Sequence, residues 1–235
     1  MTIETPTFAR IKALTYLFGD AAKTGYLDYL AAKESIERRG QDCDCPQLEE
    51  FTRRQEIAGL QTIVFAGMCF ESAIYDYAAV HLGDAYVRDH LDKLDLVSKW
   101  VICIRLISKQ EIDKSKAPFA ALQRLVRARN NIVHHKSEPL RGPSIEAQLA
   151  KVMAQDKKLE EDVHNAFRAM VLMSFELERI VGRFGWPLPH FGQSMLPQED
   201  FPPQLRSVID DCHRIVFRKS KIQDSERSEG DEPNL

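Results

Sequence analysis

The sequence predicts an all-α protein: an up-and-down helical bundle that carries a C-terminal appendage. Apolar residues recur at intervals of three and four through most of the first 185 residues, and no alternating apolar run is bounded by hairpin turn pairs. A length of 235 residues suits one sizeable core with an appendage. The expected division is a bundle over residues 1–185, a proline-rich connection with a short helix over 186–219, and a disordered tail over 220–235.

Two long helices are expected in the first third of the chain. Residues 6–38 are apolar at helical spacing and stop before Gly40. A second helix begins near Pro46, which suits a first helical turn, and ends at Gly83. The centre of this second helix, residues 63–80, is apolar nearly all round, so we expect it in the middle of the bundle.

Shorter helices are expected next, over residues 84–91 and 94–109. Pro118 then opens a further amphipathic helix. Ser144 can cap a long last helix that stops at Gly185.

The composition changes after Gly185. Five prolines fall within residues 186–203 and predict an extended connection, after which residues 204–219 can form one helix. The tail from Ser220 is polar and charged, with too little apolar surface to offset the entropy of ordering it.

The composition predicts an ordinary globular protein of the cytoplasm. The formal net charge is -3, so any contact with nucleic acid must come from local asymmetry of charge. The five cysteines are an odd number and suggest no disulfide framework. The first ten residues lack an apolar signal core, and the apolar runs are interrupted by charges, so no membrane segment is expected.

We also expect neither a metal nor another cofactor. Cys43 and Cys45 are separated by one residue, which is closer than the cysteine spacing of tetrahedral zinc sites. No glycine-rich phosphate loop occurs in the chain.

The most informative segment is residues 129–135, which read Arg-Asn-Asn-Ile-Val-His-His at the end of an apolar helical run. An arginine side chain can fork onto phosphate oxygens and does not lose its charge. Histidine titrates near neutral pH and serves as a general acid or base. The two side chains lie roughly 140° apart around an unbroken helix at about 100° per residue, so a helix that ends near Asn130–Asn131 would bring them together more easily.

Other arginine and histidine pairs at similar spacing have a poorer context. Arg183 and His190 straddle a Gly-Trp-Pro break, and Arg206 and His213 lie in the appendage. Only the pair Arg129 and His134 ends a strong amphipathic helix in a basic segment.

The string Leu-Val-Arg-Ala-Arg-Asn-Asn-Ile-Val-His, residues 125–134, resembles the signature of the HEPN superfamily, an all-helical group rich in RNA-cleaving toxins. The family pattern is an arginine, usually followed by a polar residue, and a histidine four to six residues later. In this chain these are Arg129, Asn130 and His134. The helix order over residues 5–185 is also similar, so the resemblance implies a bundle of HEPN type.

The resemblance implies a metal-independent endoribonuclease of a toxin–antitoxin or phage-defence system. Arg129 would stabilise the phosphorane, His134 would transfer protons, and Asn130 would orient the phosphate or the imidazole. The expected partners are RNA, a second copy of the chain whose motif shares one cleft, and an antitoxin protein.

A lone acid and a basic segment accompany the motif. Glu71 sits in the most apolar helix on a face expected to point inward, and Arg129 is its expected partner, with a structural role slightly preferred over a catalytic one. Residues 114–141 hold seven basic side chains against Glu138 alone. The side chains expected to bind RNA are Arg124, Arg127, His135 and Lys136. Alternatively, this basic face is balanced by acids on a neighbouring helix.

Two alternatives remain open. The chain can be a non-catalytic HEPN-like module that binds RNA or a protein, with Arg129 and His134 in structural or binding roles. It can also be an unrelated helical scaffold, in which case Arg129 would be fully exposed.

Overall fold

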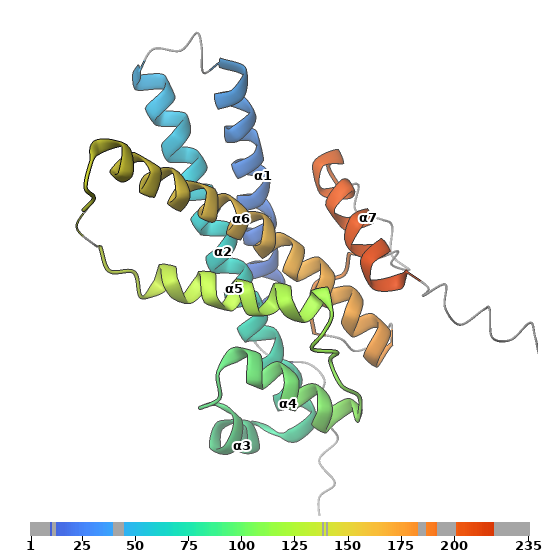
Figure 1. Ribbon diagram of the computed structural model, residues 1–235. Helices are drawn as coiled ribbons and strands as arrows, with labels where there is room; N and C mark the ends of the chain where they lie inside the picture. The colour runs from blue at the N-terminus through green and yellow to red at the C-terminus, as the bar shows by residue number, and fades with distance from the viewer. Residues whose placement is uncertain are drawn as a thin grey trace, which may run out of the picture.

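The computed structural model of the chain describes residues 10, 13–39, 45–137, 139, 141–182, 187–191 and 201–218 (Figure 1). Every regular element in these residues is helical and none of them forms a strand, so the all-α class is confirmed. The elements are α1 (Thr15–Arg39), α2 (Cys45–Leu82), α3 (Asp84–Tyr86), the π-helical turn η1 (Val87–Leu91), α4 (Leu96–Ser108), α5 (Ala117–Val133), α6 (Ile145–Val181) and α7 (Pro203–Phe217).

Helices α1 and α2 lie side by side because glycines let their backbones approach closely. A Cβ atom on Gly25 would lie 3.1 Å from the carbonyl oxygen of Ala58 and 3.0 Å from Oγ1 of Thr62. A Cβ on Gly59 would lie 2.9 Å from Cγ2 of Val163, on α6. Gly25 of α1 and Gly59 of α2 therefore serve helix packing, and α1 passes through Gly25 without a break.

The core lies around the middle parts of α2 and α6. Within residues 63–80 of α2 every side chain is buried or half-buried except that of Glu71, which confirms the expected central position of this stretch. Residues 169–177 of α6 are all buried. The rest of the protein therefore encloses the middle of α6 on every side.

Local signals define several helix ends as expected. The hydroxyl of Ser144 accepts a hydrogen bond from the backbone N–H of Ala147 at 3.2 Å and so caps α6. Pro118 lies in the first turn of α5. Gly83, at φ 89°, follows the end of α2.

The described part of the C-terminal region packs on the bundle. Residues 187–191 are not helical, as predicted, and Leu188 within them is fully buried. The hydroxyl of Ser174 on α6 donates a hydrogen bond to the carbonyl oxygen of Pro189 at 2.9 Å. Helix α7 buries Leu205 and Cys212 completely. The predicted tail, residues 220–235, lies outside the described residues.

The three cysteines whose side chains are described are free thiols in the core. Cys69, Cys103 and Cys212 are all buried. Burial raises the pKa of the Cys69 thiol to about 12. These side chains act as small apolar groups.

Helix α2 requires a correction to the expectation that no apolar run reaches membrane-spanning length. Residues Pro46–Leu82 contain an 18-residue stretch that is long and apolar enough to cross a membrane by composition, and 56% of that stretch is buried inside the bundle. The core helix of a soluble protein passes the same test, so this finding alone is weak evidence for a membrane span.

The contribution of α7 to the stability of the protein can be measured by truncating one buried and one exposed side chain of this helix. Leu205→Ala removes a fully buried side chain and is expected to lower the free energy of unfolding by about 2–5 kcal/mol. Ile215 is 43% exposed, so Ile215→Ala is expected to cost about 0.5 kcal/mol or less. Denaturant melts of both variants check this. Equal small losses would show that α7 does not belong to the core.

Candidate functional site

The motif lies at the C-terminal end of α5. The helix continues through Asn130 and Asn131 to Val133, so it does not end at the two asparagines. His134 follows as the C-cap residue, and its backbone N–H donates to the carbonyl oxygen of Asn130 at 3.0 Å. The two asparagines thus remain in the last helical turn.

Arg129 bridges α5 and α2. Its Nη2 donates to Oε2 of Glu71 at 3.1 Å, and its Nη1 donates to Oδ1 of Asn130 at 3.1 Å. The side chain of Arg129 is 26% exposed. The alternative of an unrelated helical scaffold predicted a fully exposed Arg129, and that prediction is wrong. The predicted pair of Arg129 and Glu71 is confirmed.

The expected burial of Glu71 is wrong, since its side chain is 48% exposed. Its neighbours Phe70 and Ala73 face the core, whereas Glu71 lies at the margin where α5 crosses α2. The carboxylate therefore reaches both Arg129 and solvent. Solvent screening makes an ion pair of this kind worth about 1 kcal/mol or less, so it orients Arg129 more than it stabilises the fold.

Gly67 makes room for the stem of Arg129. A Cβ atom at this position would lie 2.8 Å from Cγ and 3.3 Å from Cβ of Arg129. Gly67 precedes Glu71 by four residues, so both lie on one face of α2. The same face thus admits the aliphatic part of Arg129 and binds its guanidinium.

The side-chain Nε of Arg129 is buried and has no hydrogen-bond partner among the described residues. The two Nη atoms bear the hydrogen bonds to Glu71 and Asn130. The guanidinium is therefore held at its outer end, where the side chain remains partly open to solvent.

The structure does not join His134 to Arg129. The side chains of His134, His135 and Lys136 are exposed, and no hydrogen bond or ion pair links the two motif residues within the described part of the chain. Because the helix is unbroken between them, they keep their roughly 140° separation around its axis. One copy of the chain therefore presents the arginine and the histidine at the same helix end but in different directions.

Part of the basic segment is already neutralised. Nε of Arg124 donates to Oδ1 of Asp162 at 2.8 Å, and Nη2 donates to Oε2 of Glu161 at 3.0 Å. The hydrogen bond from Arg124 to Asp162 raises the pKa of the guanidinium. Arg124 thus ties α5 to α6, as the alternative of balancing acids anticipated, whereas Arg127 is exposed and makes no ion pair among the described residues.

Sequence reasoning missed a buried carboxylate on α6. The side chain of Glu176 is 1% exposed and accepts two hydrogen bonds from Arg179, at 2.6 and 3.0 Å. It is an acid inside an apolar run, the same signal that singled out Glu71. An acid within an apolar run therefore marks both Glu71 and Glu176 in the sequence, although only Glu71 was identified from it.

A second missed group joins α1 and α6. The hydroxyl of Tyr26 lies 2.9 Å from Nδ1 of His164. Burial lowers the pKa of His164 and raises the pKa of Tyr26 to about 12. No sequence signal marks this pair, because His164 follows a charged stretch and its partner is 138 residues away.

Within the described residues, no group of three or more histidine, cysteine, aspartate or glutamate side chains is placed to hold a metal ion. Cys43 lies outside the described residues, so the expectation of no zinc site at Cys43 and Cys45 stays a prediction. The arrangement at the end of α5 can supply a fixed cation, an amide and exposed imidazoles.

Comparison with known proteins adds no relative. No protein-family model, no curated protein sequence and no solved structure matches the chain.

Because Gly67 lies close to the side chain of Arg129, the effect of Gly67→Ala on the free energy of unfolding should depend on which side chain occupies position 129. Gly67→Ala should destabilise the protein by about 1–3 kcal/mol because the new methyl group overlaps Cγ of Arg129. In an Arg129→Ala background the same change should be neutral, or stabilising by up to about 1 kcal/mol through helix propensity.

Arg129→Met is the matched control, since methionine keeps Cγ and loses the charge. Gly67→Ala should remain destabilising in this background. Denaturant melts with and without Gly67→Ala in each of the three backgrounds, six proteins in all, measure these effects. The same cost of Gly67→Ala in the Ala and Met backgrounds would show that the side chain of residue 129 does not set the packing of α5 on α2.

Proposed function

We propose that the protein is a metal-independent endoribonuclease of HEPN type, and that it acts in a toxin–antitoxin or phage-defence setting. The observation that carries the proposal is the held, partly exposed guanidinium of Arg129, with Asn130 beside it and His134 at the same helix end. These are the residue types that phosphodiester cleavage requires.

The reaction follows from the chemistry of the groups. The ribose 2′-oxygen attacks the adjacent phosphorus as His134 removes the hydroxyl proton, and the bond to the 5′-oxygen of the next nucleotide breaks. Arg129 stabilises the charge on the non-bridging oxygens, and a protonated imidazole supplies the proton of the leaving oxygen. The products are a 2′,3′-cyclic phosphate and a 5′-hydroxyl.

Glu71 and Asn130 have positioning roles in this proposal. Each accepts one hydrogen bond from Arg129, so the guanidinium is oriented before RNA arrives. The remaining candidates for phosphate contact are Arg127, His135 and Lys136, which are exposed. Arg124 is not proposed to contact phosphate, because two carboxylates on α6 already bind it.

The active form is proposed to be a dimer in which the motif helices of two copies share one cleft. The separation of Arg129 and His134 on a single helix supports this, because a second copy can bring its own motif opposite the first. A row of exposed apolar side chains follows the motif on the first turns of α6, on the same side of the molecule as the end of α5 (Figure 1). Its members are Ile145, Leu149, Val152 and Met153. Exposed apolar rows of this kind mark interfaces.

The first test is cleavage of RNA by the purified protein in EDTA. Arg129→Ala and His134→Ala should each lower the rate by at least about 10²-fold, since each removes electrostatic or acid–base assistance. His135→Ala should have a smaller effect than His134→Ala, which identifies the histidine that transfers protons. Gel analysis of a labelled RNA measures the rate and the cyclic-phosphate end.

Arg53→Ala is the matched control, because Arg53 is exposed on α2 and makes no ion pair among the described residues. Its rate should equal that of the unaltered protein. Cleavage that survives both motif substitutions would remove these residues from the mechanism. Binding of RNA without any cleavage would favour the alternative of a non-catalytic binding module.

The dimer has its own test. Leu149→Glu and Met153→Glu place a charge on side chains that are 59% and 63% exposed, so the fold of a single copy should tolerate them while association is lost. Light scattering at tens of micromolar should report a dimer for the unaltered protein and a monomer for the pair of substitutions. Leu17→Glu, at a 64% exposed leucine on α1, is the control and should remain dimeric. A fully active monomer would contradict the dimer.

A further inference from the structure

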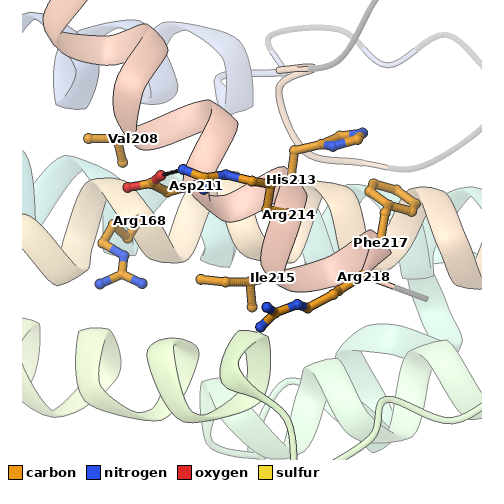
Figure 2. A pocket seen from close by; sticks show the side chains of 8 residues that line it. All are labelled: Arg168, Val208, Asp211, His213, Arg214, Ile215, Phe217 and Arg218. Atoms are coloured by element: carbon orange, nitrogen blue, oxygen red, sulfur yellow. Dashed lines mark hydrogen bonds and ion pairs between the residues drawn. The ribbon is translucent and has the colours of Figure 1, made fainter. Parts of the chain in front are cut away.

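A groove of ≈ 620 Å³ lies between α7 and α6 and is separate from the motif (Figure 2). It is lined by Arg168 of α6 and by residues of α7 and its end: Val208, Asp211, His213, Arg214, Ile215, Phe217 and Arg218. Arg168 lies one turn beyond Asn165, whose side-chain amide donates to the carbonyl oxygen of Ala121 on α5 at 3.0 Å. The groove therefore runs beside the N-terminal half of the motif helix.

The lining carries an excess of positive charge. Three arginines face one acid, and Asp211 is paired with Arg214. Arg168 and Arg218 form no ion pair within the described residues, and both are exposed. Figure 2 shows the guanidinium group of Arg168 near one end of the lining and that of Arg218 beneath Ile215, both on the side that faces α5. Two separated cations without acidic partners are an electrostatic site for an extended anion.

Ile215 lies between these cations, and the rings of His213 and Phe217 lie beyond Arg218 at one end of the lining (Figure 2). The rings of His213 and Phe217 are 4.7 Å apart between centroids and tilted by 39°. Phe217 is 37% exposed and Ile215 is 43% exposed, although both belong to a helix that packs on the bundle. Exposed rings beside arginines are the elements of sequence-tolerant binding to single strands, in which bases stack and phosphates pair with guanidinium groups.

We propose that this groove binds single-stranded RNA, with Arg168 and Arg218 on phosphates and Phe217 against a base. The inference rests on the proposed function in that RNA is the substrate, and it assigns a second contact region away from the motif. An acidic peptide fits less well. The apolar lining is short, and Asp211 and Arg214 interrupt it, whereas an amphipathic helix requires a continuous apolar strip.

The geometry places the groove as an extension of the substrate-binding surface. Helix α5 has 17 residues and is therefore about 25 Å long, with the groove beside its first half and Arg129 near its other end. Along α5, the exposed side chain of Arg127 falls between the turns beside the groove and the motif. The groove thus sets affinity for long RNA, and the motif performs the cleavage.

The experiment measures binding of the full chain to a fluorescein-labelled single-stranded RNA whose 2′-oxygens are methylated, so that it cannot be cleaved by 2′-hydroxyl attack. Fluorescence polarisation is recorded over a range of salt concentrations. Arg168→Ala and Arg218→Ala should each reduce the slope of log K against log salt by about 0.7, the value for one phosphate contact on a single strand. The double variant should bind at least about tenfold more weakly at low salt. Arg53→Ala is the control for charge alone and should leave the slope unchanged.

Phe217 gives a test that does not depend on charge. Phe217→Leu should weaken binding roughly 5- to 100-fold because stacking is lost, and Phe217→Tyr should restore it. The ring of Phe217 also lies 5.8 Å from that of Phe175. Thermal melts of both variants check whether the loss of this contact destabilises the protein; unchanged melting temperatures show that weaker RNA binding has another cause.

The experiments test the groove proposal and the ribonuclease proposal independently. If binding and its salt slope are unchanged by the arginine and Phe217 substitutions, the groove proposal is overturned, whereas the ribonuclease proposal depends only on Arg129 and His134. If the groove variants lose binding and no RNA is cleaved, the groove proposal stands and the ribonuclease proposal fails. An acidic peptide that binds the groove while the RNA does not would overturn the RNA assignment.

Discussion

The complete burial of the middle of α6 is the constraint on which the rest of the structure depends. A helix enclosed on every side needs cover from several neighbours, and α1, α2, α5 and α7 all pack on it. Its polar groups must also be satisfied, because an unpaired polar group in an apolar interior costs free energy. Ser174 donates to the carbonyl of Pro189, and Glu176 binds Arg179. The described residues after α6, in 187–191 and 201–218, therefore contribute to the core.

The same constraint positions the motif. Helix α5 is held against α6 by Leu122 and Leu125, which are fully buried, and by the ion pairs of Arg124 with Glu161 and Asp162. Once α5 is fixed along α6, its last turn must cross α2, and Gly67 is what allows Arg129 to lie in that crossing. The guanidinium then reaches Glu71 and Asn130 without becoming fully buried. Packing at one end of the helix thus determines the exposure of the cation at the other.

Features encoded by near neighbours in the chain could be predicted, and features set by tertiary packing could not. Ser144 and Pro118 act within their own helical turns, so both helix starts were correctly placed. Glu71 and Glu176 are both acids in apolar runs, yet Glu71 is 48% exposed and Glu176 is 1% exposed. Their difference depends on which neighbouring helix covers each face, and periodicity within a single helix does not contain that information. The pairing of Glu71 with Arg129 was predicted correctly, although the burial from which it was argued is wrong, because the carboxylate also reaches solvent.

The local distribution of charge reconciles the net charge of -3 with the proposed binding of RNA. The acids of α6 are placed against Arg124, so they neutralise a cation that serves packing and leave the exposed Arg127 and Lys136 unopposed by them. On α7, Asp211 is paired with Arg214, whereas Arg168 and Arg218 have no acidic partner among the described residues. Attraction between exposed charges is screened within about 10 Å at 0.1 M salt, so these local excesses matter more to a bound phosphate than the sum over the molecule. Arg124 is thus held by acids on α6, Arg129 is paired with Glu71 but partly exposed, and Arg127 is exposed without an acidic partner among the described residues. The spacing of these arginines along the sequence does not distinguish the three cases.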